Sequence, residues 1–161
     1  MTPETLDQRN QIERAISGQT LCDELRRTAD EHGEQPALSD RGPAGDWNTV
    51  SWSQARQTAL ALAAGFIALG CQPGDRIALM LPNRSEHVLA DLGAVHAGAV
   101  PVTFYATLAP AQVSYVASDC GARVAVLDGA DELARWQPVL GELTGLEKII
   151  VRDAAACPPG A

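Results

Sequence analysis

The sequence predicts an α/β fold in which an N-terminal helix and a β-hairpin precede βαβ units that form a mostly parallel, doubly wound sheet. Four continuous apolar runs of strand length begin at positions 76, 99, 123 and 148, so their starts are 23, 24 and 25 residues apart. The segments between them have helical patterns. Strand–helix repeats of this length indicate right-handed βαβ crossovers, and continuous apolarity is typical of strands buried on both faces.

The segment before these repeats predicts one helix and one hairpin. Thr20 is a candidate helix N-cap with Asp23 three residues later, and Gly33 is a candidate left-handed C-cap. Two short strand-like runs, 36–40 and 47–52, are separated by a turn-rich link. They predict a β-hairpin.

The next segment predicts a long helix with one apolar face. Ser53 is its candidate N-cap, and Gly70 and Pro73 are candidate terminators. Apolar side chains recur at i, i+4, i+7, i+11 and i+14, a spacing that places them along one side of a helix. These side chains are Ala55, Ala59, Leu62, Phe66 and Leu69.

Three further helices are expected between the apolar runs. Asn83 and Glu86 form a candidate cap pair before the first of them. Pro110 opens the second helix at its first turn, and Gly121 closes it. The third is interrupted by Pro138, so it is expected to be bent or split.

The chain divides into three predicted parts. Residues 1–19 form a polar N-terminal arm without the apolar stretch of a signal peptide. Residues 20–152 carry all the predicted core elements. Residues 153–161 have no periodicity and are interpreted as a truncated linker.

Composition excludes several classes of protein. The chain has 161 residues, is 46% hydrophobic and 20% charged, and carries a formal net charge of −8. These values are unlike those of disordered chains. No basic cluster suited to phosphates is present, so no nucleic-acid partner is expected. No apolar stretch reaches the ~18 residues of a transmembrane segment, and a cytoplasmic protein is expected.

The cysteines and histidines do not form a predicted metal site. The four cysteines are far apart and include no CxxC pair, which favours reduced thiols over a disulfide framework or a zinc site. None of the three histidines has a second His or Cys at metal-ligand spacing. The sequence also lacks GxGxxG after a strand, GxxxxGK[ST] and GxSxG. From the residues alone, this is an α/β domain without a visible active site.

Three motifs nevertheless occur in a recognisable order. They are VSWSQA at 50–55, GCQPGDRIALMLPN at 70–83 and HAGAVPV at 96–102. Together with their spacing, they resemble the N-terminal region of the adenylate-forming, or AMP-binding, superfamily of acyl-CoA synthetases, luciferases and peptide-synthetase adenylation domains. The resemblance runs from Thr20 to Arg152. The stretch FYATLAPAQ, residues 104–112, favours the long- or medium-chain fatty acyl branch, that is, a fatty acid–CoA ligase.

The resemblance implies a two-step reaction of the parent enzyme. A fatty acid and ATP give acyl-adenylate and pyrophosphate, and coenzyme A then displaces AMP to form the thioester. ATP, Mg²⁺ and CoA are the implied cofactors of the parent family. The family's Ser/Thr/Gly-rich phosphate loop, adenine motif, ribose-binding aspartate and C-terminal domain are missing from these 161 residues. We therefore expect a fragment with no catalytic residue, no cofactor or metal of its own, and no activity alone.

The resemblance carries over a few residues on the CoA side. In acetyl-CoA synthetases, the loop after the second motif approaches the nucleotide end of coenzyme A. The matching positions are Phe104, Tyr105 and Ala106, and Arg135 lies near phosphate-contacting arginines of that subfamily. The alternatives are core packing for Phe104, a rim aromatic for Tyr105 and a solvated helix charge for Arg135.

Three other interpretations remain at this stage. The chain is half of a split acyl-CoA synthetase, or a non-catalytic module that binds acyl groups or CoA or has a regulatory role, or its parent makes acyl-AMP for a carrier protein. A truncated sheet would expose apolar surface, so self-association or a complementing chain is expected through that surface. Acyl chain length is not encoded in this segment.

Overall fold

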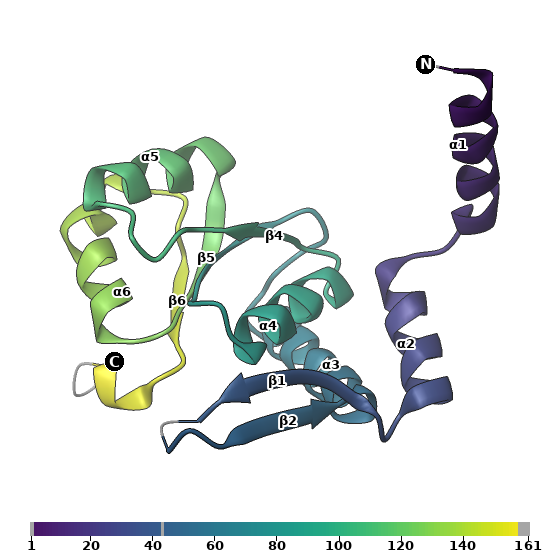
Figure 1. Cartoon of the computed structure of the whole chain (residues 1–161). Helices are drawn as coiled ribbons and strands as arrows, with labels where there is room; N and C mark the ends of the chain where they lie inside the picture. Colours follow the sequence, from purple (N-terminus) through teal and green to yellow (C-terminus); the bar gives the residue numbers. More distant parts are fainter. Residues whose placement is uncertain (1, 43, 158–161) are drawn as a thin grey trace.

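The computed structural model describes residues 2–42 and 44–157, and Figure 1 shows how their elements are arranged. Position 43 in the hairpin link and the last four residues of the predicted linker lie outside this range. The elements in chain order are α1 (Pro3–Ile16), α2 (Leu21–His32), β1 (Pro36–Arg41), β2 (Trp47–Ser51), α3 (Trp52–Ala68), β3 (Arg76–Met80), α4 (Ser85–His96), β4 (Val100–Thr103), α5 (Pro110–Cys120), β5 (Ala122–Leu127), α6 (Ala130–Trp136), the 3₁₀ helix η1 (Gln137–Glu142), β6 (Lys148–Val151) and the 3₁₀ turn η2 (Ala154–Ala156).

The predicted α/β class and parallel sheet are confirmed. β3 to β6 form one four-stranded parallel sheet in the order β4-β3-β5-β6. β1 and β2 form the separate antiparallel hairpin that the sequence predicts, with Arg41 opposite Trp47 next to the turn. In Figure 1 the hairpin lies below α4 and in front of part of α3, apart from the sheet.

Both faces of the sheet are covered by helices, as expected for a doubly wound arrangement. Alternate β3 side chains point to opposite faces: Ile77 and Leu79 pack with α3 and α4, whereas Ala78 and Met80 pack with α5, α6 and η1. The second core contains a fully buried Trp136, whose indole donates to the Met80 sulfur. The central strands β3 and β5 are covered on both faces, whereas the edge strand β4 exposes 48% of Val100. The expected association through exposed sheet surface stays a prediction.

The amino ends of three strands are joined by one arginine. Arg123, at the start of β5, pairs with Asp75 just before β3 at 2.5 Å and with Glu147 just before β6 at 2.7 Å. The hydrogen bonds that Arg123 donates to the Glu147 carboxylate are the largest cause of the raised pKa of Arg123. This network lies at the edge of the sheet opposite the expected ligand crevice, and it stabilises the register of the strands.

Local sequence signals place several helix boundaries correctly. Thr20 and Asp23 form the predicted reciprocal cap of α2. α5 begins at its proline and ends at Gly121, which adopts a left-handed conformation with φ of 64°. The helix that contains Pro138 changes from α6 to η1 at Gln137, so it is split as expected.

Two predicted caps of α2 and α3 are wrong. Gly33 is right-handed, with φ of −45°. A Cβ there would lie 2.4 Å from the Ser53 hydroxyl, so close approach of the two segments favours glycine at this position. α3 is capped by Ser51 and not by Ser53, because Ser51 and Gln54 satisfy each other's main-chain N–H groups.

Residues 2–20 lie apart from the core. Every side chain described in this stretch is exposed, although residues 3–16 form the helix α1, which the interpretation as a polar arm did not include. α1 projects away from the rest of the molecule in Figure 1. None of the helices in the described part of the chain is long and apolar enough to cross a membrane. The division of the chain at residue 20 stays a prediction.

Candidate functional site at the carboxyl edge of the sheet

The parallel sheet has a topological switch point between β3 and β5. The two strands are neighbours, but the helix after β3, α4, packs on one face and the helix after β5, α6, packs on the other. The loops that leave the carboxyl ends of these strands therefore diverge. In open α/β sheets, ligands bind in the crevice that such divergence creates.

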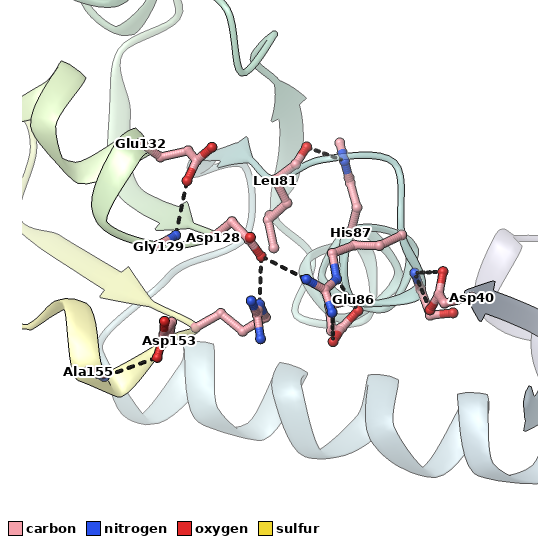
Figure 2. A network of polar contacts seen from close by, with 12 residues as sticks. Asp40, Leu81, Glu86, His87, Asp128, Gly129, Glu132, Asp153 and Ala155 are labelled. Carbon is pink, nitrogen blue, oxygen red and sulfur yellow. Dashed lines mark hydrogen bonds and ion pairs between the residues drawn. The ribbon is translucent and has the colours of Figure 1, made fainter. Parts of the chain in front are cut away.

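A network of charged side chains occupies this edge (Figure 2). Arg84 follows β3, Asp128 follows β5 and Arg152 follows β6. The Asp128 carboxylate accepts from Arg152 Nε at 2.5 Å and from Arg84 Nη1 at 3.5 Å. It therefore joins the ends of three strands. Its hydrogen bond to Arg152 is the largest cause of the raised pKa of that guanidinium.

The two arginines of this network are paired within the chain. Arg84 also binds the Glu86 carboxylate through two hydrogen bonds, of 2.6 and 2.9 Å. Two guanidinium groups thus face two carboxylates, Glu86 and Asp128. Because the charges balance, the network is suited to fixing the loops rather than to binding an anion.

A histidine fixes the neighbouring edge of the same region. His87 Nδ1 lies 3.1 Å from the Leu81 carbonyl, and Nε2 lies 3.2 Å from the Thr103 hydroxyl. Since a carbonyl only accepts, Nδ1 donates to Leu81, while Nε2 shares a hydrogen bond with the Thr103 hydroxyl. A main-chain carbonyl, and not a carboxylate, orients the imidazole. Because Leu81 follows β3 and Thr103 ends β4, the ring joins the carboxyl ends of these two strands. One turn later on α4, burial raises the pKa of Asp91.

At each helix N-terminus of this edge, a side chain of the chain itself accepts from one main-chain N–H group. Both Asp40 oxygens accept from the Ser85 N–H at the start of α4, at 3.0 Å. Asp40 lies in β1, so the predicted Asn83–Glu86 cap pair is wrong and a residue from the hairpin takes that role. At α5, Gln112 accepts from Ala109 N, and at the short α6, Glu132 accepts from Gly129 N. Each of these contacts satisfies one of the several N–H groups that a helix N-terminus presents.

The predicted CoA-side residues are brought to one loop, the one between β4 and α5. Phe104 is buried, with 1% of its surface exposed, and its ring centroid lies 5.4 Å from that of Trp136. Tyr105 is 78% exposed. Arg135 comes from α6, and its Nη1 donates to the Leu108 carbonyl of this loop at 3.2 Å. Arg135 Nε is buried without a hydrogen-bond partner.

Sequence reasoning missed Arg84, Asp128 and Arg152. A signal was present, because each follows a predicted parallel strand within a few residues and the carboxyl ends of parallel strands meet at one edge. Across residues 2–42 and 44–157, no group of three or more His, Cys, Asp or Glu side chains is placed to hold a metal ion.

Comparison with known proteins gives a consistent result. A family model described as "AMP-binding enzyme" matches residues 25–160. An uncharacterized protein of Mycobacterium tuberculosis is 35% identical over 109 residues, which are 68% of this chain and 61% of that protein. The long-chain-fatty-acid–CoA ligase ACSBG2 of Xenopus laevis is 30% identical over 132 residues, which are 81% of this chain and 18% of the ligase.

Comparison with solved structures agrees with the sequence comparison. The inhibitor-bound crystal structure of the N-terminal domain of FACL13 from Mycobacterium tuberculosis superposes with a TM-score of 0.71 and 29% identity. The match covers 82% of this chain and 33% of that one. The chain thus spans less than two thirds of the length of each of these relatives.

Proposed function

This chain belongs to the AMP-binding enzyme family, and from that premise we propose that residues 1–161 form the N-terminal part of the adenylating domain of a fatty acid–CoA ligase. In the parent reaction, ATP converts a fatty acid to acyl-adenylate with release of pyrophosphate, and the thiol of CoA then displaces AMP. A carboxylate is a poor electrophile because it is negatively charged and has no good leaving group. Adenylation removes that charge and provides AMP as the leaving group.

The identity with a long-chain-fatty-acid–CoA ligase supports the fatty acyl assignment. It extends over 132 residues, which are 81% of this chain. In this proposal the chain provides the parallel sheet and the β4–α5 loop of the parent's large domain. Other segments, in the same polypeptide or in a second one, hold ATP and Mg²⁺.

The pairing of the arginines at the carboxyl edge carries the proposal that residues 1–161 do not adenylate alone. A triphosphate needs several free N–H groups or cations in one place. At the carboxyl edge, α4, α5 and α6 begin at N–H groups that Asp40, Gln112 and Glu132 already satisfy. The nearby arginines Arg84 and Arg152 are paired with carboxylates. Neither Arg84 nor Arg152 is therefore free to neutralise the phosphates of ATP.

We also propose that the β4–α5 loop faces the CoA side of the parent site. Exposed Tyr105 and neighbouring Ala106 would contact CoA, and buried Phe104 would support them from below through Trp136. Arg135 holds the loop through the Leu108 carbonyl, and its remaining N–H groups suit a phosphate.

ATP–pyrophosphate exchange with a panel of fatty acids tests the function. We expect no exchange by the purified chain alone, and exchange when a second chain supplies the phosphate loop and the C-terminal domain of a family ligase. Exchange by the chain alone, with contaminating ligase excluded, would contradict the proposal. No exchange in the mixture would favour the non-catalytic binding module.

The reconstituted pair also tests the loop. Tyr105→Ala should raise the KM for CoA several-fold and leave pyrophosphate exchange unchanged, since exchange needs no CoA. Tyr115→Ala is the matched control, because Tyr115 is an equally exposed tyrosine, 71%, on α5. Equal KM values for CoA in the two variants would show that Tyr105 does not contact CoA. That result would leave the ligase assignment intact.

A further inference from the structure

Helix α3 is apolar on two opposite sides. Its inner side packs into the molecule through the buried residues Ala55, Ala59, Ala63 and Phe66. Its outer side exposes 47% of Leu60 and 57% of Ile67. Helices that are apolar all round are normally buried on all sides, so the outer side of α3 lacks a partner in the described structure.

The outer side forms one continuous stripe along the helix. Its exposed residues follow at i, i+3, i+4, i+7, i+10 and i+11, which is the spacing of a single helical face. They are Gln57, Leu60, Ala61, Ala64, Ile67 and Ala68, and we call them the α3 outer face. The sequence has no charged residue in the 18 positions between Arg56 and Asp75. This is unusual for the surface of a chain in which 20% of the residues are charged.

We propose that the α3 outer face is the contact between two copies of this chain, with the two α3 helices antiparallel about a two-fold axis at Ala64. Positions 60 and 68 are equally distant from 64, and so are positions 61 and 67. An antiparallel pair centred at Ala64 therefore places Leu60 opposite Ala68, and Ile67 opposite Ala61. Each large side chain meets a small one, and the same patch serves both copies.

Other arrangements of the same face fit less well. A parallel pair in register places Leu60 against Leu60 and Ile67 against Ile67, so large side chains oppose each other and small ones face a gap. Two copies that each carry a net charge of −8 repel each other, and an uncharged face allows the closest approach at least cost. A strongly charged partner would find no complementary charge on this face.

The size of the α3 outer face limits the expected affinity of the dimer. The 17 residues of α3 span about 25 Å, so one helix pair buries less than the roughly 1,200 Å² of a standard interface. We expect a reversible dimer with a dissociation constant on the order of 10–100 µM. The inference does not depend on the proposed ligase function.

Analytical ultracentrifugation of the full chain from about 5 to 500 µM tests the proposal. We expect the sedimentation coefficient to rise with concentration toward that of a dimer. Ala64→Arg places two like charges at the two-fold axis and should weaken dimerisation at least 10-fold. The matched control is Ala134→Arg, an exposed alanine of α6 far along the chain from this face, which should dimerise like the parent protein. Circular dichroism confirms that both variants are folded.

A charge exchange tests the register. Ala61→Glu alone and Ile67→Lys alone should each weaken the dimer, whereas the double variant should restore it, because position 61 of one copy faces position 67 of the other. A monomer at all concentrations would overturn the proposal, as would a dimer that Ala64→Arg leaves unchanged. Failure of the double variant to recover would overturn the antiparallel register.

Discussion

Two glycines in the packed helices α3 and α4 have opposite surroundings. A Cβ at Gly93 would lie 2.6 Å from the Leu62 Cβ and 3.4 Å from the Ala59 carbonyl oxygen, so the glycine lets the helices approach closely. A Cβ at Gly65 would have no atom within 4 Å, and Gly65 does not have a positive φ. Glycine therefore has a packing role at position 93, whereas at position 65 it has no packing role within the monomer.

The matched substitutions follow from this contrast. Gly65→Ala should raise the free energy of unfolding by about 0.5–1 kcal/mol, because alanine restricts the unfolded chain and favours helix. Gly93→Ala should lower it by about 1–3 kcal/mol, because the added methyl group forces α3 and α4 apart. Urea unfolding at a few micromolar protein measures both. Equal effects of the same sign would contradict the close packing at Gly93.

At the scale of elements, the hairpin is attached to the sheet domain through a helix cap. Asp40 in β1 accepts from Ser85 N at the first residue of α4, 45 positions later in the chain. The N-cap residue Arg84 makes no side-chain cap hydrogen bond and pairs with Glu86 instead. Local sequence signals predicted a cap at Asn83, and the tertiary contact supplies a stronger acceptor with a full negative charge at the helix N-terminus.

Removal of this contact should destabilise the junction between the hairpin and α4. Asp40→Ala should lower the free energy of unfolding by about 1–2 kcal/mol, and Asp40→Asn by less, since the amide keeps one acceptor oxygen but no charge. Thermal and urea unfolding measure the change, and amide hydrogen exchange at Ser85 locates it. Unchanged stability and exchange in the alanine variant would show that the cap contributes nothing.

At the scale of the whole molecule, the packed unit consists of two helical layers around one sheet, with α1 outside it (Figure 1). The two core clusters contain no residue before Ala63 on one face and none before Ala78 on the other. α2 and the hairpin pack against α3 and α4, but the described side chains of residues 2–20 are exposed. Stability should therefore not depend on the first 19 residues.

Deletion of residues 1–19 tests this division. The shortened chain should unfold cooperatively with a midpoint within about 2 °C of the full chain, because less than 1 kcal/mol of packing is lost. Differential scanning calorimetry gives both the midpoint and the enthalpy. A fall of more than about 5 °C would mean that α1 contributes to the packed unit.

The sequence alone determined features that depend on neighbouring residues. The Thr20–Asp23 cap, the break at Pro138, the end of α5 at Gly121 and the strand–helix period all follow from backbone preferences and hydrophobic spacing along the chain. The three ordered motifs at 50–55, 70–83 and 96–102 indicated the family.

Only the tertiary structure decided which distant residues meet. Arg84 and Asp128 are 44 positions apart, Asp40 and Ser85 are 45 apart, and Arg135 reaches back 27 positions to Leu108. Such pairs depend on strand order and on which face each crossover helix covers, and local periodicity encodes neither. For the same reason the sequence showed that α3 carries apolar residues, whereas only the fold showed which of them face solvent.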